Sequence, residues 1–187
     1  MRPFVNAGFA VFAPAWRGEN GNPGFHELYY GEVDDAVAAL EYLATRPDID
    51  ASRLFATGHS AGGTIAMLLA EISPRLRGAM ACGGCPDMQA FTDAFGQPMS
   101  DEAPFNFKNP LEGDLRSPGR HIRDLKCPLA LYFSPTDDAM YLTQATELEK
   151  KARELNKRVT VESIAGADHY TALAPAVQKA IAFFRSL

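Results

Sequence analysis

Residues 54–63 read LFATGHSAGG, and this stretch decides the fold. Leu54–Thr57 is short and apolar, as is typical of a buried strand, and Ser60–Ile72 has few charges and predicts a buried helix. Between the two, Gly58-His59-Ser60-Ala61-Gly62 matches G-x-S-x-G, the pattern of a sharp strand-to-helix turn that presents a serine. We therefore expect a strand, a tight turn at Ser60 and a buried helix.

The glycines of this turn have a steric reason. A chain that reverses so sharply holds Ser60 in a strained backbone conformation, and side chains at positions 58 and 62 are expected to collide with the neighbouring turn. The strain lifts the hydroxyl away from the sheet edge, and the amides at the start of the helix favour developing negative charge there. The pattern nominates Ser60 as a nucleophile; the alternative is a glycine-rich turn with a capping serine.

Outward from this turn, short apolar runs alternate with amphipathic stretches. We expect strands at 9–14, 54–57, 77–82, 129–133 and 159–164, and helices at 31–44, 60–72, 143–155 and 170–186. This alternation predicts an α/β fold, a mostly parallel sheet with helices on both faces. Residues 86–124 lose the periodicity, and we expect them to form a lid or pocket wall within a single domain, 1–187.

Composition narrows the class of protein. The chain has 187 residues, 47% of them hydrophobic and 22% charged, which is typical of about one globular domain. Its net charge of -5 argues against a nucleic-acid partner. No apolar run approaches the roughly 18 residues of a membrane span, and the N-terminal stretch does not look like a signal peptide. Three cysteines are too few for a disulfide framework, so we expect a reducing cytoplasm.

A serine nucleophile needs a base, and the base needs an orienting carboxylate. In an open α/β sheet both are expected just past the carboxyl ends of strands. His169 follows the strand predicted at 159–164 and is the candidate base, because the other histidines lie in less suitable places. Asp137 and Asp138 follow the strand predicted at 129–133. Either could be the acid, and the other is then a turn or cap aspartate.

Three stretches together carry a family resemblance: GHSAGG at 58–63, SPTDDAM at 134–140 and GADHY at 166–170. They resemble the α/β-hydrolase fold and, within it, the catalytic domain of the prolyl oligopeptidase family; dienelactone hydrolase-like and acetyl esterase-like proteins share much of the pattern. The similarity extends to most of residues 8–187 and is least clear at 86–110. It implies Ser60 as nucleophile, Asp137 as acid, His169 as base and the Ala61 amide as one oxyanion donor.

The sequence departs from this family pattern in two places. The acid loop usually begins with His-Gly, whereas this chain has Phe133-Ser134. The family also has strands before the segment that begins at Arg2, one of them lying between the strands expected here at 9–14 and 54–57, and its loop supplies a second oxyanion donor. We therefore expect an N-terminally truncated sheet whose unpaired backbone groups cost about 1–3 kcal/mol each. The gap could be closed by these strands, by upstream sequence or by another chain.

Several further residues are candidates for the site. We expect Trp16, His59, Phe91, Phe105 and Tyr170 to line a substrate pocket, although the aromatic residues of the excursion, Phe95 and Phe107 included, are equally suited to anchor it to the core.

Two other features have simpler structural interpretations. Arg17 is expected to form an ion pair with Glu32, Asp34 or Asp35 rather than to bind a substrate carboxylate. CGGCP at 82–86 has the spacing of a redox motif, but no thioredoxin-like pattern and no second metal-binding pair accompany it. We predict no metal and no cofactor.

The sequence thus predicts a serine hydrolase that cleaves a small-molecule ester or a peptide through an acyl-enzyme. The alternative is a catalytically impaired remnant or a binding module that lacks a complete oxyanion hole. We expect no membrane partner, and a homo-oligomer stays open.

Overall fold

The computed structural model describes residues 2–95, 104–106, 108–137 and 139–187. The strands in this part are β1 (Leu54–His59), β2 (Leu76–Cys82), β3 (Leu129–Phe133) and β4 (Val159–Ser163). The helices are α1 (Arg2–Asn6), α2 (Gly31–Ala44), α3 (Ala61–Ile72), α4 (Met88–Phe95), α6 (Pro110–Leu115), α7 (Ala139–Glu154) and α8 (Leu173–Arg185), with 3-10 turns η1 (Pro118–Arg120) and η2 (Ile122–Asp124).

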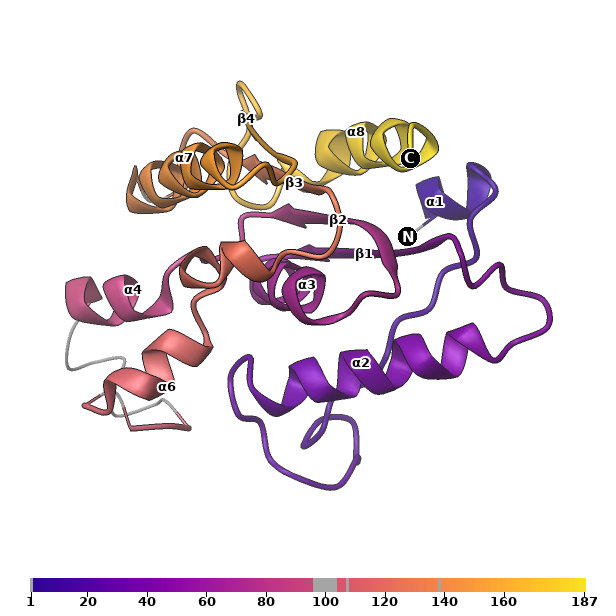
Figure 1. Cartoon of the computed structure of the whole chain (residues 1–187), viewed down its shortest axis with the longest axis horizontal. Coiled ribbons are helices and arrows are strands. Elements are labelled where there is room, and N and C mark those ends of the chain that lie inside the picture. The colour runs from indigo at the N-terminus through magenta and orange to yellow at the C-terminus, as the bar shows by residue number, and fades with distance from the viewer. Residues whose placement is uncertain (1, 96–103, 107, 138) are drawn as a thin grey trace.

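The sheet is parallel and its strands follow the chain in order, β1-β2-β3-β4. Right-handed crossovers between neighbouring parallel strands place the connecting helices on one face. Figure 1 shows α3 and α2 on one side of the strands, whereas α8 returns across the other side next to α1. The predicted α/β fold with helices on both faces is confirmed.

Side chains of the central strands alternate between two cores, because successive residues of a strand point to opposite faces. In β3, Leu129, Leu131 and Phe133 join the core under α2, α3 and α7, while Ala130 and Tyr132 join the core under α8. All five are at most 7% exposed. Burial on both faces explains why these strands read as continuous apolar runs rather than as alternating ones.

The second core is closed by aromatic rings from distant segments. Phe55 of β1 stacks on Phe184 of α8 with ring centroids 4.5 Å apart, and Phe4 of α1 stacks on the same ring at 6.2 Å. Phe9 meets Phe4 and Phe55 edge-on, each at 5.9 Å. Large aromatic rings bury much apolar surface, so this cluster holds the N-terminal segment against α8 and β1.

The prediction of a strand at residues 9–14 is wrong. Residues 9–16 have no regular secondary structure, and β1 is bonded to β2 alone among the described residues. A strand needs a ladder partner, and an apolar run without one stays irregular. Within the run only Phe9 is fixed by the aromatic cluster, while Phe12 is 46% exposed.

Two helices begin elsewhere than the sequence predicts. Helix α7 begins at Ala139 instead of Thr143. Helix α8 begins at Leu173 instead of Tyr170, because Asp168 accepts hydrogen bonds from the amides of Tyr170 and Thr171 and holds them in a turn. The short helix α1 was not predicted.

The excursion at 86–124 contains α4, α6, η1 and η2 in its described part. Its anchor is Arg116, whose side chain is 3% exposed. The guanidinium donates to the carbonyls of Glu27 and Leu28, pairs with Glu112 at 2.6 Å and lies 4.0 Å from the centre of the Phe105 ring. The excursion is thereby tied to the loop that precedes α2.

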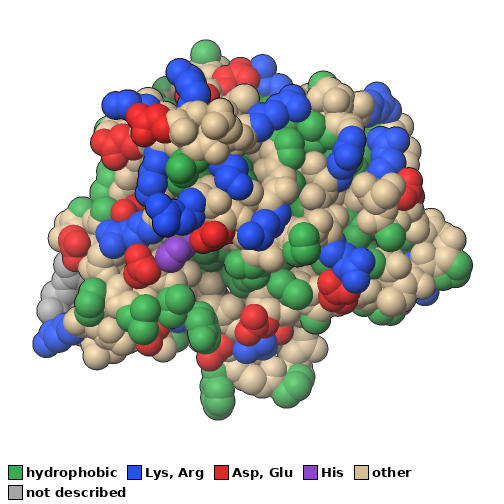
Figure 2. Space-filling model, viewed as in Figure 1, with side chains coloured by type: hydrophobic (Ala, Val, Ile, Leu, Met, Phe, Trp, Pro, Cys, Tyr) green, Lys and Arg blue, Asp and Glu red, His purple; other side chains and the backbone are tan. Residues whose placement is uncertain are grey.

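The surface carries mixed charge. Lys and Arg side chains are interspersed with Asp and Glu side chains on the face shown in Figure 2. None of the helices in the part of the chain that the structure describes is long and apolar enough to cross a membrane.

Candidate active site

The turn between β1 and α3 holds Ser60 at φ 54° and ψ -121°, a backbone conformation that residues other than glycine rarely adopt. The Ser60 amide donates to the Cys82 carbonyl of β2 at 2.8 Å, and the Ser60 carbonyl accepts from the amides of Gly63 and Thr64. The turn is thus bonded to the neighbouring strand on one side and to the helix on the other, which maintains the strain predicted for this serine.

Only one of the two predicted steric collisions is present. A Cβ on Gly58 would overlap the backbone of Gly62, so position 58 has no room for a side chain. A Cβ on Gly62 would meet nothing within 4 Å, and the prediction of a collision there is wrong. The steric restriction applies at position 58 and not at position 62, because Gly62 already belongs to α3 and a Cβ there would point into open space.

The Ala61 amide begins α3 beside the serine. Among the residues that the structure describes it has no hydrogen-bond partner, as expected for the first amide of a helix. It is the one donor that we assign to an oxyanion position, and the positive end of the helix dipole acts at the same place.

His169 and Asp137 form a direct pair. His169 Nδ1 lies 2.6 Å from Asp137 Oδ1, and the Asp137 side chain is 3% exposed. The other carboxylate oxygen, Oδ2, accepts the Ser134 amide at 2.6 Å. Because a carboxylate only accepts, Nδ1 carries the proton and Nε2 of the neutral ring is left free to accept one. Asp138, the other candidate acid, lies outside the described residues.

The turn that carries Ser60 and the ring of His169 both lie against the end of β2. Ser60 is bonded to Cys82, and a Cβ on the next residue, Gly83, would lie 2.8 Å from His169 Cε1 and 3.8 Å from Asp137 Oδ2. Gly83 has φ +62° and leaves the space that the imidazole fills. The described residues show no hydrogen bond from Ser60 Oγ to His169; such contacts often tighten only when substrate binds.

Two of the candidate pocket residues lie against the base. His59 Nε2 donates to the His169 carbonyl at 2.7 Å, and the two rings are 4.7 Å apart. Tyr170 is 79% exposed, with its ring 5.3 Å from His169 and 6.1 Å from His59. The carbonyl can only accept, so His59 carries its proton on Nε2.

The other three candidates lie elsewhere. Trp16 packs on the core formed with α2 and α3. Phe91 contacts Tyr141 of α7 with ring centroids 5.8 Å apart, and Phe105 lies under Arg116. Phe107 lies outside the described residues. The structure therefore brings His59 and Tyr170 to the candidate base, and places Trp16, Phe91 and Phe105 in packing contacts.

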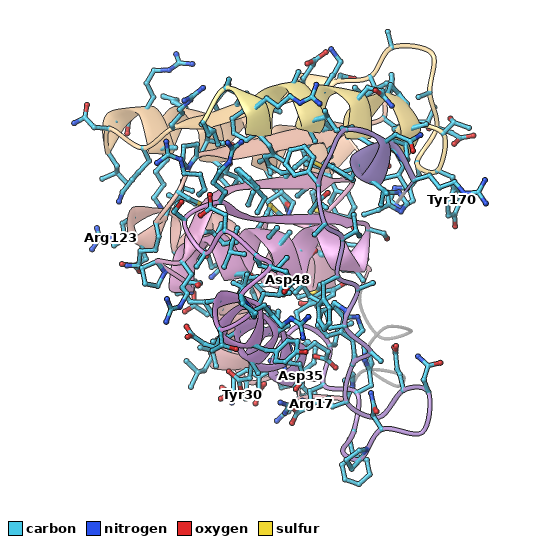
Figure 3. All side chains as sticks on the ribbon, turned by 90° about the vertical axis from the view of Figure 1, so that its right-hand side faces the viewer. Arg17, Tyr30, Asp35, Asp48, Arg123 and Tyr170 are labelled. Carbon is cyan, nitrogen blue, oxygen red and sulfur yellow. The ribbon has the colours of Figure 1, made fainter. Side chains whose placement is uncertain are left out.

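The ion pair predicted for Arg17 is with Asp35. Its guanidinium lies 2.8 Å from Asp35 and 3.1 Å from Glu27, and the hydrogen bond from Arg17 holds the pKa of Asp35 below its usual range. Glu32 instead meets His26 at 3.0 Å. In Figure 3, Arg17, Asp35 and Tyr30 lie together, and Tyr170 lies apart from them.

The cysteines have no features of a reactive site. Burial raises the pKa of Cys82 to about 11 and that of Cys85 to about 12, so both are thiols near neutral pH. Within the described residues no group of His, Cys, Asp and Glu side chains could hold a metal ion.

Ser134 is a residue of the candidate site that sequence reasoning missed. Its amide donates to Asp137 Oδ2, and its hydroxyl donates to the Ala167 carbonyl. The signal in the sequence is the departure from His-Gly at positions 133–134, which places a hydroxyl where the family pattern has glycine.

The model of the prolyl oligopeptidase family matches residues 1–185. The chain belongs to the prolyl oligopeptidase family. The uncharacterized peptidase YtmA of Bacillus subtilis is 27% identical over 172 residues, which are 89% of this chain and 67% of that protein.

Solved structures agree with this family fold. A puromycin-hydrolysing peptidase of Mycobacterium tuberculosis superposes with a TM-score of 0.71 at 24% identity, covering 84% of this chain and 26% of its own. A truncated carbohydrate esterase from gut microbiota gives a TM-score of 0.74 at 14% identity, covering 88% of this chain and 72% of its own. The chain thus has the α/β-hydrolase fold and spans about two thirds of the Bacillus protein and a quarter of the Mycobacterium peptidase.

Proposed function

We propose that the chain acts as a serine hydrolase that cleaves an ester or a peptide bond through an acyl-enzyme. The observation that carries the proposal is the Asp137–His169 pair at 2.6 Å, held beside the strained turn that presents Ser60. Family membership supports the same class of reaction.

In the proposed reaction Ser60 Oγ attacks the substrate carbonyl. His169 Nε2 takes the serine proton and later gives it to the leaving group, while Asp137 keeps Nδ1 protonated and stabilises the positive ring. The Ala61 amide donates to the oxyanion. Water then attacks the acyl-enzyme with His169 as its base, which restores Ser60 and releases the acid.

The proposed substrate class rests on the relatives that share the fold. Relatives that share the fold are named as peptidases and as esterases, so we propose a small ester or a peptide as substrate. The oxyanion donor that we assign in the described part of the chain is the Ala61 amide, and one such donor typically contributes about 10²–10³ in rate. The alternative proposal is a catalytically impaired remnant or a binding module. A cytoplasmic location stays a prediction.

The test is active-site labelling with a fluorophosphonate, combined with hydrolysis of a p-nitrophenyl ester and of an aminoacyl-p-nitroanilide. We expect the wild type to be labelled, Ser60→Ala to be unlabelled and His169→Gln to be labelled far more slowly. Ser52→Ala, which alters an exposed serine in the turn before β1, is the matched control and should be labelled like the wild type. A folded wild type that reacts with none of these reagents would favour the binding module.

A further inference from the structure

Ser134 is the first residue after β3, and its side chain lies between the two loops that carry the candidate acid and base. The residue is 1% exposed. Its hydroxyl donates to the Ala167 carbonyl at 2.8 Å, accepts the Thr136 amide at 2.9 Å and lies 2.8 Å from Thr136 Oγ1. A hydroxyl has one proton and two lone pairs, so these three contacts use its full capacity.

The backbone of the same residue contacts the acid itself. The Ser134 amide donates to Asp137 Oδ2 at 2.6 Å, and the other oxygen of that carboxylate meets His169 Nδ1. One buried residue thus touches the acid through its amide and the base-bearing loop through its hydroxyl. Both contacts lie within three residues of the group that they hold.

The base-bearing loop, residues 165–172, packs on β3 through Ala167 and Ala172, but few other hydrogen bonds join it to the acid side of the site. The Ile164 amide donates to the Phe133 carbonyl at 2.7 Å as the last bond of the β3–β4 ladder, before the loop begins. The bonds of Asp168 to Tyr170 and Thr171 are internal to the loop. Apart from the Asp137–His169 pair, the bond from the Ser134 hydroxyl is the one hydrogen bond between the two loops in the described part of the chain.

We propose that Ser134 is a positioning residue, which fixes the distance between the acid loop and the base loop and so keeps His169 Nδ1 on Asp137. The inference rests on the proposed function for its catalytic consequence. Glycine, which usually occupies this position in the family pattern, has no side chain to make this link. This chain therefore uses a serine hydroxyl where a glycine would leave the Ala167 carbonyl without that donor.

Substitution of the hydroxyl separates the two contacts. Ser134→Ala keeps the amide bond to Asp137 but leaves the Ala167 carbonyl and the Thr136 amide without their partner. Ser134→Thr and Ser134→Val have nearly the same shape and differ in the hydroxyl, so comparing them cancels any effect of the added methyl group. Thr171→Val removes a hydroxyl that bonds only within the base loop and serves as the control.

Two readouts report on the pair. The proton of His169 Nδ1, observed by NMR in protein with ¹⁵N-labelled histidine, should resonate far downfield because its hydrogen bond to the carboxylate is short. The rate of fluorophosphonate labelling reports on the reaction. We expect Ser134→Ala and Ser134→Val to lose the downfield signal. We also expect both to be labelled about 10–100 times more slowly, because a small misplacement of a catalytic group lowers the rate by this much. Ser134→Thr and Thr171→Val should keep both properties.

The proposal is overturned if Ser134→Val and Ser134→Thr, both folded by circular dichroism, show the same downfield proton and the same labelling rate. It is also overturned if Ser134→Ala is folded and keeps both the downfield proton and the labelling rate at wild-type values. If the wild type is not labelled but its downfield proton is lost only in the variants without the hydroxyl, the proposed function fails and the positioning role stands.

Discussion

The loops that carry Asp137 and His169 and the segment at residues 9–30 are both irregular, and they are held in opposite ways. In the first region the contacts between loops are short and local to the site: 2.6 Å between acid and base, and 2.8 Å from Ser134 to Ala167. The second region has no strand ladder, has positive φ at Leu28 and Tyr29, and leaves Phe25 84% exposed. It is held by ion pairs of Arg17 and by hydrogen bonds from Arg116, which lies more than 80 residues away along the chain.

The difference teaches where this fold concentrates its precision. Buried, fully paired polar contacts fix a group to within the small distance that proton transfer tolerates. The ion pairs of Arg17 are partly exposed, and pairs of this kind contribute about 1 kcal/mol or less to stability. We therefore expect substitutions in the first region to change reactivity and substitutions in the second to change stability alone.

The largest effect is expected at the nucleophile turn. Gly58→Ala places a Cβ into the backbone of Gly62, so we expect a loss of stability above about 3 kcal/mol, or no folded protein at all. Gly62→Ala is the matched control, because its Cβ meets nothing, and it should leave the melting temperature unchanged or slightly raised. Thermal melts that rank the two variants equally would contradict the steric account of the turn.

A buried carboxylic acid near the end of α3 will affect any pH-dependent comparison of stability between the two regions. Glu71 is 3% exposed, and burial together with nearby Asp124 raises its pKa to about 9. The folded state keeps this proton up to about pH 9, whereas the unfolded chain releases it above about pH 4.5, so stability falls as the pH rises between these values.

Glu71→Gln should remove that slope. We expect similar stability of wild type and variant near pH 4, and a more stable variant at pH 8 by an amount on the order of 5 kcal/mol. Urea unfolding at both values measures it, with Glu147→Gln on the exposed side of α7 as control. A difference that is independent of pH would show that Glu71 is ionised in the folded protein.

A smaller effect is expected where β1 contacts the base. His59→Phe keeps an aromatic ring beside His169 but loses the Nε2 hydrogen bond to its carbonyl. A hydrogen bond of this kind contributes about 1 kcal/mol, so labelling of Ser60 should slow roughly fivefold. Tyr170→Phe, which keeps the neighbouring ring, should change the rate less. Equal rates for His59→Phe and the wild type would remove His59 from the account of the site.

The smallest effect tests the second region. Arg17→Gln removes the ion pairs with Asp35 and Glu27, and we expect a loss of about 1 kcal/mol or less and faster hydrogen exchange in residues 17–30. Because Arg17 lowers the pKa of Asp35, this contribution is present above the unfolded pKa near 4 and is lost as the pH falls through the folded value. Labelling of Ser60 should keep its rate, and a tenfold loss would refute the division between the regions.

The same contrast explains what the sequence could predict. The bounds of α2 and β3 followed from local apolar patterns, and the positions of Ser60 and His169 followed from motifs at strand ends. The choice of Asp137 over Asp138 followed from the family resemblance. The run at 9–14 has an equally good local pattern, but a strand depends on a partner that local sequence does not contain. The roles of His59 and Ser134 also escaped, because their partners lie 110 and 33 residues away along the chain.

The central claim is that Ser60 is a nucleophile activated by the Asp137–His169 pair. It is tested most directly by mapping the adduct of a fluorophosphonate on the folded chain by peptide mass spectrometry, in the wild type and in Asp137→Asn and His169→Gln. The account predicts one adduct, on the peptide that contains Ser60, formed in the wild type and slowed by orders of magnitude in both variants. An adduct on another residue, or labelling of Ser60 at the same rate in all three proteins, would contradict it.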